Sequence, residues 1–460
     1  MSKESILSNI PDYEAFLTVD ELNGALIRLG REYPDRVAVF EAGRSRKDRP
    51  IMCAKLGNGP KTALLYGCPH PNEPIGAMMC HYMARALAED KAYLESLGFT
   101  LYIIPVSDVD GTVLNEGWFK GPFTIYNYAR NYFRPDGEQQ VEWTFPMKYK
   151  RYEFNAPIPE TQALMRLIDE IKPDFIYSLH NGGFGGAYWY VGNAGGDDLY
   201  KAFHKAAERG KVPLDLGEPE MPFAESLAPA VYKMPYAADM YDFYEKFGGK
   251  DPLDMMSAGE CSASYAGPGT AMLVTELPYF YDPRVDSVKT LDYPRREAAL
   301  GKLRLIQNRM AFIKRHYEQL KTYISPDNPF AGMIASSVRL AEGSDESQRV
   351  FIMDNPDFDK PCKESEAFSN DQMTRFYNLL GGGLLLRSAE FELERFDGAE
   401  APEALLNIAN EAKEILKSEA AALEADLDYS VIPIKSLVGI QLECGLSLME
   451  YIRDNKEESK

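Results

Sequence analysis

Two of the five histidines in the 460 residues occupy positions where chemistry is expected. His70 and His180 each follow a short apolar run, in TALLYGCPH and FIYSLH. Ligands of open α/β sheets bind in the crevice beyond the carboxyl ends of the strands, so both imidazoles are expected at such an edge. His70 is followed by Glu73 in the proline-stiffened loop H-P-N-E-P. Two imidazoles and one carboxylate are a ligand set of catalytic zinc, which keeps a fourth position for water.

Other interpretations of these residues stay open. H-x-x-E alone is a weak motif, and a histidine at a strand end is often a hydrogen-bonded core residue. Glu276 strengthens the metal interpretation because it ends the apolar run MLVTEL, and a buried carboxylate is costly unless it is paired or used. Cys68 is expected to be a small buried residue rather than a ligand. The remaining histidines lie in helical segments and are interpreted as structural, with His316 on a solvated helix face.

The elements that must position these side chains alternate in type. Apolar runs at 62–67, 100–106, 175–179 and 272–277 predict buried strands, and helices are predicted at 77–88 and 160–171. This alternation predicts an α/β fold with a mostly parallel sheet and helices on both faces.

A turn-rich stretch, SPDNPF, follows the helical segment 294–323 and predicts a domain boundary. Residues 1–325 would form the catalytic domain, and 326–460 a mostly helical region of unknown role. Within that region, 401–427 reads as an amphipathic helix. Gly381–Gly383 is interpreted as a break between helices.

Composition limits the partners. Fifty Lys and Arg against 70 Asp and Glu give a formal charge of −20, so nucleic acid and anionic membranes are poor partners. The first residues lack a basic segment followed by an apolar one, and no apolar run reaches about 18 residues. The six cysteines form no C-x-x-C pair. These observations predict a cytoplasmic protein without a disulfide framework.

Five motifs in order, GCPHPNEPIG, DVDG, the arginine-containing YARNYFRP, SLHN and TELP, resemble those of the M14 zinc carboxypeptidases. The resemblance runs from about Tyr13 to Tyr323. It implies an α/β fold with a mixed, mainly parallel eight-stranded sheet. It also implies one zinc ion per chain, held by His70, Glu73 and His180, and Glu276 as general base and then general acid.

The resemblance also points to residues beyond the metal set. An arginine must stabilise the oxyanion; Arg130 lies closest to the expected place and Arg134 is the alternative. Tyr265 is the nearest candidate for the tyrosine that such enzymes carry before the catalytic glutamate, although its spacing of 11 residues is short.

One motif departs from the family. Members that trim carboxyl termini carry V-D-x-N-R-N-F, whose Asn and Arg hold the terminal carboxylate, but the corresponding text here is VEWTFP at 141–146. Glu142 could replace the acidic residue that orients the first zinc histidine. Arg134 or Arg151 could supply a new carboxylate clamp.

The sequence therefore predicts a zinc-dependent hydrolase that cleaves a peptide or amide bond. The missing Asn-Arg pair keeps open an amidase or deacylase acting on a small N-acyl compound or a cell-wall-type peptide. A non-catalytic binding protein on the same fold is the third hypothesis. The sequence leaves the oligomeric state undetermined.

Overall fold

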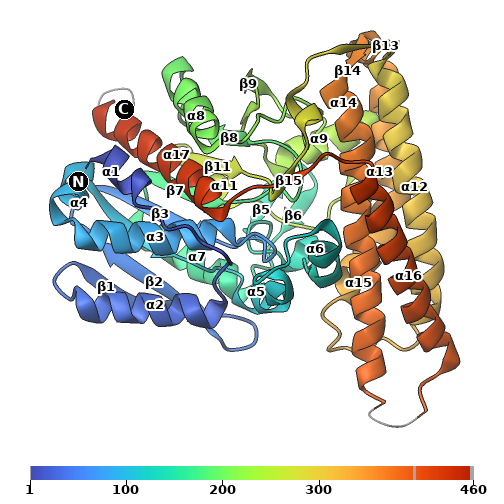
Figure 1. Cartoon of the computed structure of the whole chain (residues 1–460), viewed down its shortest axis with the longest axis horizontal. Helices are drawn as coiled ribbons and strands as arrows, with labels where there is room; N and C mark the ends of the chain where they lie inside the picture. Colours follow the sequence, from blue (N-terminus) through green and yellow to red (C-terminus); the bar gives the residue numbers. More distant parts are fainter. Residues whose placement is uncertain (1, 397–399, 456–460) are drawn as a thin grey trace.

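The computed structural model describes residues 2–396 and 400–455 and is built around one large sheet (Figure 1). Within these residues the sheet has nine strands in the order β1-β2-β4-β3-β7-β11-β8-β10-β9. They are β1 (Val37–Arg44), β2 (Pro50–Leu56), β3 (Lys61–Gly67), β4 (Phe99–Ile104), β7 (Phe175–Leu179), β8 (Tyr188–Gly192), β9 (Ser226–Ala228), β10 (Val231–Lys233) and β11 (Ala271–Glu276).

The four central strands β4, β3, β7 and β11 run parallel. On one side β2 pairs antiparallel with β4, and β1 pairs antiparallel with β2. On the other side β8 pairs antiparallel with β11, and β10 runs parallel to β8. The predicted α/β class is confirmed, and the described sheet has one strand more than the eight expected. The additional edge strand β9 spans three residues with largely exposed side chains, so it carries no periodic signal.

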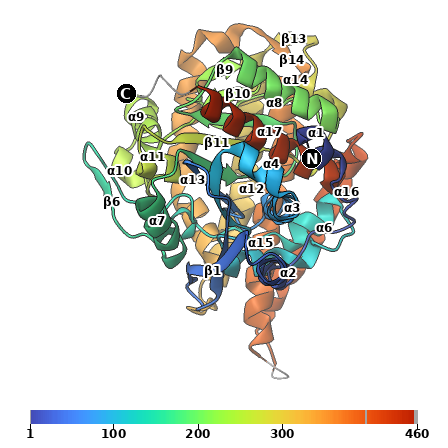
Figure 2. The same ribbon diagram turned by 90° about the vertical axis from the view of Figure 1, so that its left-hand side faces the viewer.

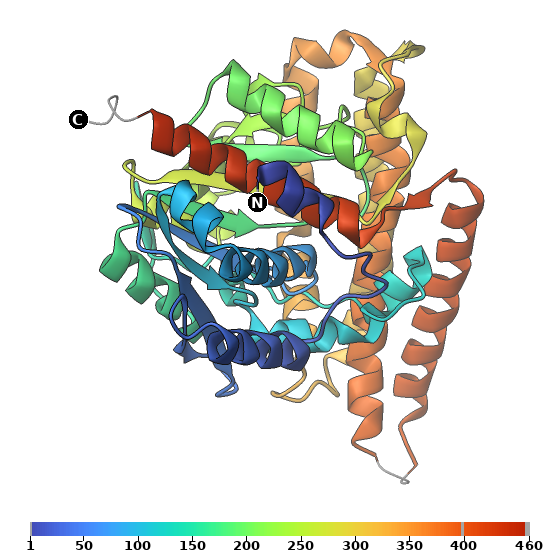
Figure 3. The same cartoon turned by 60° about the vertical axis from the view of Figure 1, so that its left-hand side comes forward.

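Helices cover both faces of the sheet (Figure 2). One face packs against α3 (Ile75–Glu89), α8 (Asp197–Gly210) and α17 (Ile434–Asp454), and the opposite face against α7 (Pro159–Ile171) and α11 (Ser262–Ala266). At the β1 edge lies α2 (Val19–Glu32), which begins with a capping box of Thr18 and Glu21. The short α1 (Lys3–Ser8) lies against α17 (Figure 3).

Long helices form a second body beside the sheet, seen at the right of Figure 1. They are α12 (Arg295–Leu320), α13 (Ala331–Asp354), α15 (Thr374–Glu394) and α16 (Glu403–Ala425), the last matching the predicted amphipathic helix. Residues after 326 thus form part of this helical body, and they also supply α17, which packs on one face of the sheet. The division between 325 and 326 stays a prediction.

Shorter elements complete the described chain: α4 (Lys91–Leu97), α5 (Val109–Asn115), α6 (Ile125–Asn131), β5 (Met147–Tyr149), β6 (Tyr152–Phe154), α9 (Ala237–Phe247), α10 (Pro252–Met255), β12 (Phe280–Tyr281), β13 (Thr290–Pro294), β14 (Pro361–Lys363), α14 (Glu364–Phe368) and β15 (Ser430–Val431). A π-helical turn, η5 (Ser369–Met373), leads into α15. Among the helices described, none is long and apolar enough to cross a bilayer.

The helix break predicted at Gly381–Gly383 is wrong, because all three glycines lie inside α15. A Cβ on Gly383 would lie 2.0 Å from the carbonyl oxygen of Ala129 in α6. The missing side chain therefore lets α15 approach α6 closely. This contact ties the helical body to the part of the chain that carries the arginine motif.

Candidate metal centre

Three neighbouring parallel strands deliver the predicted site residues to one edge of the sheet. His70 and Glu73 lie in the loop after β3, His180 directly follows β7, and Glu276 ends β11. In the sheet register Gly67 of β3 lies opposite Leu179 of β7, so the two strands end at the same level. The site is thus at the carboxyl end of the parallel strands, where open α/β sheets bind ligands.

The side chains of His70, Glu73 and His180 converge. Their ligand atoms all lie within 4.8 Å of one another, and all three residues are buried. His70 Nδ1 is 3.1 Å from Glu73 Oε1, and His180 Nδ1 is 3.3 Å from Glu73 Oε2. Tetrahedral zinc with bonds of about 2.0–2.1 Å separates its ligand atoms by roughly 3.3 Å. The spacing and the donor chemistry therefore fit a zinc ion.

Protonation of the two imidazoles differs. Burial lowers the pKa of His70 to about 3, so this ring is neutral and free to ligate. Burial also opposes the charged form of His180, but Glu73, followed by Glu276 and Glu142, raises its pKa to about 9. A cation binding here must therefore displace the His180 proton, which couples metal binding to proton release.

A buried relay fixes the orientation of His180. Its Nε2 lies 2.9 Å from Ser178 Oγ, which in turn donates to Glu142 Oε2 at 3.0 Å. Glu142 also accepts hydrogen bonds from Tyr66 and from the backbone and hydroxyl of Ser262. The structure thus places Glu142 behind the second histidine, reached through a serine, rather than beside the first histidine as the resemblance implied.

Glu276 lies beside the metal ligands. Its Oε1 is 3.6 Å from His180 Nδ1. Burial raises the pKa of Glu276 well above its ordinary range, although the charge of His180 opposes this shift. A buried carboxylate next to a metal position is placed to take a proton from water and return it to a leaving group.

The predicted arginines occupy different places. Arg134 lines the pocket, donates to Gln140 and lies 3.5 Å from Glu73 Oε1. Arg130 instead donates to both carboxylate oxygens of Glu390 in α15, at 2.9 and 2.7 Å. Arg134 is therefore the arginine beside the metal ligands, and Arg130 connects α6 to α15.

Two further candidates lie away from the pocket lining. Arg151 is exposed and donates to Asp251 at 2.7 Å. Tyr265 donates to Asp169 at 2.7 Å, beside a separate small surface depression. Neither side chain is among those that line the cavity at the metal ligands.

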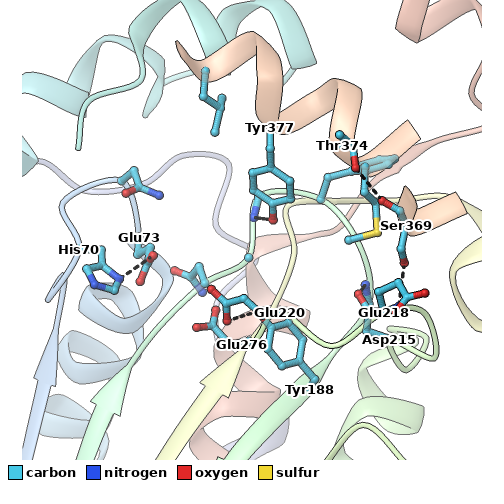
Figure 4. Close-up of a pocket in the computed structure, with 18 of the residues that line it drawn as sticks. His70, Glu73, Tyr188, Asp215, Glu218, Glu220, Glu276, Ser369, Thr374 and Tyr377 are labelled. Carbon is cyan, nitrogen blue, oxygen red and sulfur yellow. Dashed lines mark hydrogen bonds and ion pairs between the residues drawn. The ribbon is translucent and has the colours of Figure 1, made fainter. Parts of the chain in front are cut away.

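A cavity of about 510 Å³ opens next to the metal ligands, and the helical body forms one of its walls (Figure 4). That wall consists of side chains from α12, η5 and α15, namely Lys302, Ile306, Ser369, Met373, Thr374, Tyr377, Asn378 and Leu380. The loop after His180 packs directly beneath it. Gly183 donates to the hydroxyl of Tyr377, and a Cβ on Gly183 would lie 2.6 Å from the ring of Phe376. The glycines of the segment NGGFGG (181–186) thus permit α15 to pack closely over the site.

Sequence reasoning missed several residues of this cavity. Tyr377 and Lys302 come from distant helices and have no local motif. Glu220 lies in the loop between α8 and β9 and faces Glu276 in Figure 4. Tyr188 could have been found, because it begins the apolar segment YWYVG that forms β8.

The solvated position predicted for His316 is wrong. Its side chain is buried, with Nδ1 at 2.9 Å from the carbonyl of Phe312 and Nε2 at 2.8 Å from Glu411. The residue connects α12 to α16 and is structural, as the interpretation of this histidine required. All six cysteines, Cys68 included, are free and buried.

Comparisons with known proteins agree with the site. Residues 22–214 match the sequence model of the family described as zinc carboxypeptidase, Peptidase_M14. Zinc carboxypeptidase A 1 of Anopheles gambiae is 29% identical over 126 residues, 24% of this chain and 29% of that protein. Carboxypeptidase A6 of Mus musculus is 31% identical over 109 residues, 22% of this chain and 25% of that protein. The alignments thus span less than a third of these relatives.

Solved structures give weaker similarity. Carboxypeptidase A from Helicoverpa armigera has a TM-score of 0.38 and 15% identity, covering 60% of this chain and 70% of that one. A metallo-carboxypeptidase from Burkholderia cenocepacia has a TM-score of 0.33 and 17% identity, covering 57% and 60%. By the family match and the curated relatives, the chain is similar to the M14 zinc carboxypeptidases over part of its length, residues 22–214 in the family match.

Proposed function

We propose that the protein is a zinc-dependent hydrolase of peptide or amide bonds, with one zinc ion per chain, acting in the cytoplasm. The observation that carries this proposal is the convergence of His70, Glu73 and His180 with Glu276 beside them. Two imidazoles and a carboxylate favour zinc over magnesium or calcium, which prefer oxygen ligands.

The chemistry follows from the placement of the side chains. Zinc, when bound, supplies a Lewis acid and a water of lowered pKa. Glu276 takes the proton of the attacking water and delivers it to the leaving amine. Arg134 carries the positive charge that stabilises the negative charge developing on the carbonyl oxygen. Arg130 is not proposed for that role, because Glu390 already binds its guanidinium.

A small substrate is the second candidate, within an amidase or deacylase. The cavity volume of about 510 Å³ is that of a small-molecule site, and α15 closes one side of it. Arg151, one of the two arginines considered as a carboxylate clamp, pairs with Asp251 outside the cavity. These features support short substrates, whether the scissile bond lies at a peptide end or in an N-acyl compound.

Metal analysis and one substitution test the proposal. We expect about one zinc per chain in the purified protein and its loss in His180→Ala. Glu276→Gln should retain zinc and lose turnover. Persistent activity in Glu276→Gln would show that another group is the base. A zinc-loaded protein that cleaves no amide at all would favour the non-catalytic binding protein.

Short peptides with free and amidated carboxyl termini separate the two substrate classes. Strong preference for the free terminus indicates a carboxypeptidase. Equal cleavage of both, together with cleavage of N-acyl amino acids, indicates the amidase or deacylase. The charge of −20 supports the further proposal that neither nucleic acid nor anionic membrane is a partner.

A further inference from the structure

The cavity holds one carboxylate that is neither part of the metal set nor neutralised by an ion pair among the described residues. Besides Glu73 and Glu276, three carboxylates line the cavity: Asp215, Glu218 and Glu220. Glu218 forms a bidentate pair with Arg295 and also accepts from Asn370, so its charge is already neutralised. Glu220 differs, because no cation in the described part of the chain lies within ion-pair distance of it.

Asp215 stabilises the backbone of the loop that leads to Glu220. Its two carboxylate oxygens accept the backbone N–H groups of Gly186 and Gly217, each at 3.2 Å. Burial raises its pKa to about 6, so it is still mostly ionised at pH 7. A Cβ on Gly217 would lie 1.8 Å from Ser369 Oγ, which shows how tightly the loop packs against the helical body. The segment leading to Glu220 is therefore held in place.

Two tyrosine hydroxyls fix Glu220 next to the reaction centre. Tyr188 and Tyr190 both donate to its Oε2, at 3.2 and 3.1 Å. They lie two residues apart on β8 and so share one face of the sheet. Tyr188 is the register partner of Glu276, and such cross-strand pairs have Cβ atoms about 4.5–5.5 Å apart. Figure 4 shows Glu220 adjacent to Glu276, with Tyr377 across the cavity.

The negative charge of Glu220 is not neutralised by an ion pair within the described residues. Glu220 and Glu276 both carry carboxylate groups, which repel each other when ionised. Two cations of the cavity lining, Lys302 on α12 and Arg134, interact with Glu220 electrostatically, but neither lies within ion-pair distance of it. Both hydroxyls bind Oε2, while the Glu220 side chain remains accessible. A positive group entering the cavity would gain a charge-assisted hydrogen bond and relieve the repulsion.

We infer that Glu220 is a specificity-determining residue that binds a positively charged group of the substrate beside the scissile amide. The substrate class is therefore a short peptide or N-acyl compound carrying an ammonium or guanidinium next to the cleaved bond. This inference rests on the proposed hydrolase function, which supplies the scissile bond. Recognition of the charge itself requires only the cavity and its tyrosine-held carboxylate.

Matched peptides test the inference. Acetyl-Ala-Ala-Xaa and acetyl-Ala-Xaa-Ala, with Lys, Gln or Glu at Xaa, place the charge on either side of the bond. The ratio of kcat/KM for Lys over Gln should be about 10- to 100-fold in one of the two series, and Glu220→Gln should abolish it. Glu220→Gln keeps an acceptor for both tyrosines. Glu225→Gln, an exposed carboxylate paired with Lys233 on the same connection, is the control and should keep the ratio.

Two kinetic results would overturn the inference. One is an unchanged Lys-to-Gln ratio in Glu220→Gln in both series. The other is preference for Glu at Xaa, which would indicate that Lys302 recognises a substrate carboxylate. Calorimetric binding of Nα-acetyl-lysine and Nα-acetyl-glutamine decides the matter even without turnover. Selective lysine binding that Glu220→Gln removes, in a protein that cleaves no peptide, would refute the hydrolase and support the subsite. Equal binding of both probes would refute the subsite.

Discussion

Removing the hydroxyl of Ser178 should weaken zinc binding without touching a metal ligand. Ser178 has one hydroxyl hydrogen, which it donates to Glu142 Oε2 at 3.0 Å. Its oxygen must then accept the Nε2–H of His180 at 2.9 Å. Once a metal has displaced the Nδ1 proton, this bond keeps the remaining His180 proton on Nε2 and leaves the Nδ1 lone pair for the metal. Ser178→Ala therefore removes the acceptor that selects the ligating tautomer.

The size of the effect follows from burial. Ser178 is fully buried and His180 nearly so. A buried N–H without a partner costs about 1–3 kcal/mol, and the metal-bound tautomer must keep that N–H. Zinc affinity should therefore fall about 10- to 100-fold, the range usual for the outer partners of metal-ligating histidines.

Ser262→Ala is the matched control. Ser262 is as buried as Ser178 and also donates its hydroxyl to Glu142, at 3.0 Å, but makes no bond to His180. Zinc dissociation constants from competition with a chelator of known affinity should separate the two variants. The rise in Tm on adding zinc should shrink only in Ser178→Ala. If both variants bound zinc as the unmodified protein does, the relay would have no part in holding the metal ligand.

Three further outcomes are expected. Arg134→Ala should lower kcat about 10²- to 10³-fold, whereas Arg130→Ala should alter mainly Tm; a larger loss of kcat in Arg130→Ala would reverse the two roles. Gly383→Ala should lower the free energy of unfolding by about 1–3 kcal/mol in denaturant titrations, while Gly269→Ala, where a Cβ meets open space, should change it little. Burial raises the pKa of Asp108 to about 7, above about 3.9 when unfolded, so its contribution to the unfolding free energy falls as pH rises from about 4 to 7. Asp108→Asn should flatten that pH dependence by at most about 4 kcal/mol, and an unchanged slope would contradict the assignment.

The convergence of the candidate metal ligands and Glu276 at one sheet edge was predictable, because its signals are local. An apolar run that ends in a polar residue indicates both a strand and the position of its carboxyl end. Neighbouring parallel strands bring these carboxyl ends to the same edge of the sheet. His70, His180 and Glu276 all carry this signal. The strand positions at 62–67, 175–179 and 272–277 were predicted to within a residue or two for the same reason.

The choice between Arg130 and Arg134 depended on geometry that spacing does not reveal. Arg130 lies in the last turn of α6, and Arg134 comes just after the helix ends. The position of Arg130 on α6 directs its side chain toward α15, and no local sequence pattern indicates this contact. The cavity wall that contains Lys302 and Tyr377 could not be predicted from the sequence either, because it forms only when helices far apart in the chain pack together. His316 could have been recognised, because Ile313, His316 and Leu320 follow the helical period of a buried face.

The helix α17 has a consequence for how the candidate metal site is assembled. Gln441 of α17 donates to the carbonyl oxygen of His180 at 2.9 Å, and Tyr177 of β7 donates to the carbonyl of Gln441. The backbone at a metal ligand is thus held by residues made 261 positions later on the ribosome. During synthesis, the nascent chain exposes every ligand long before it can lock them in place. The backbone at His180 can therefore be held in this way only after α17 has been synthesised.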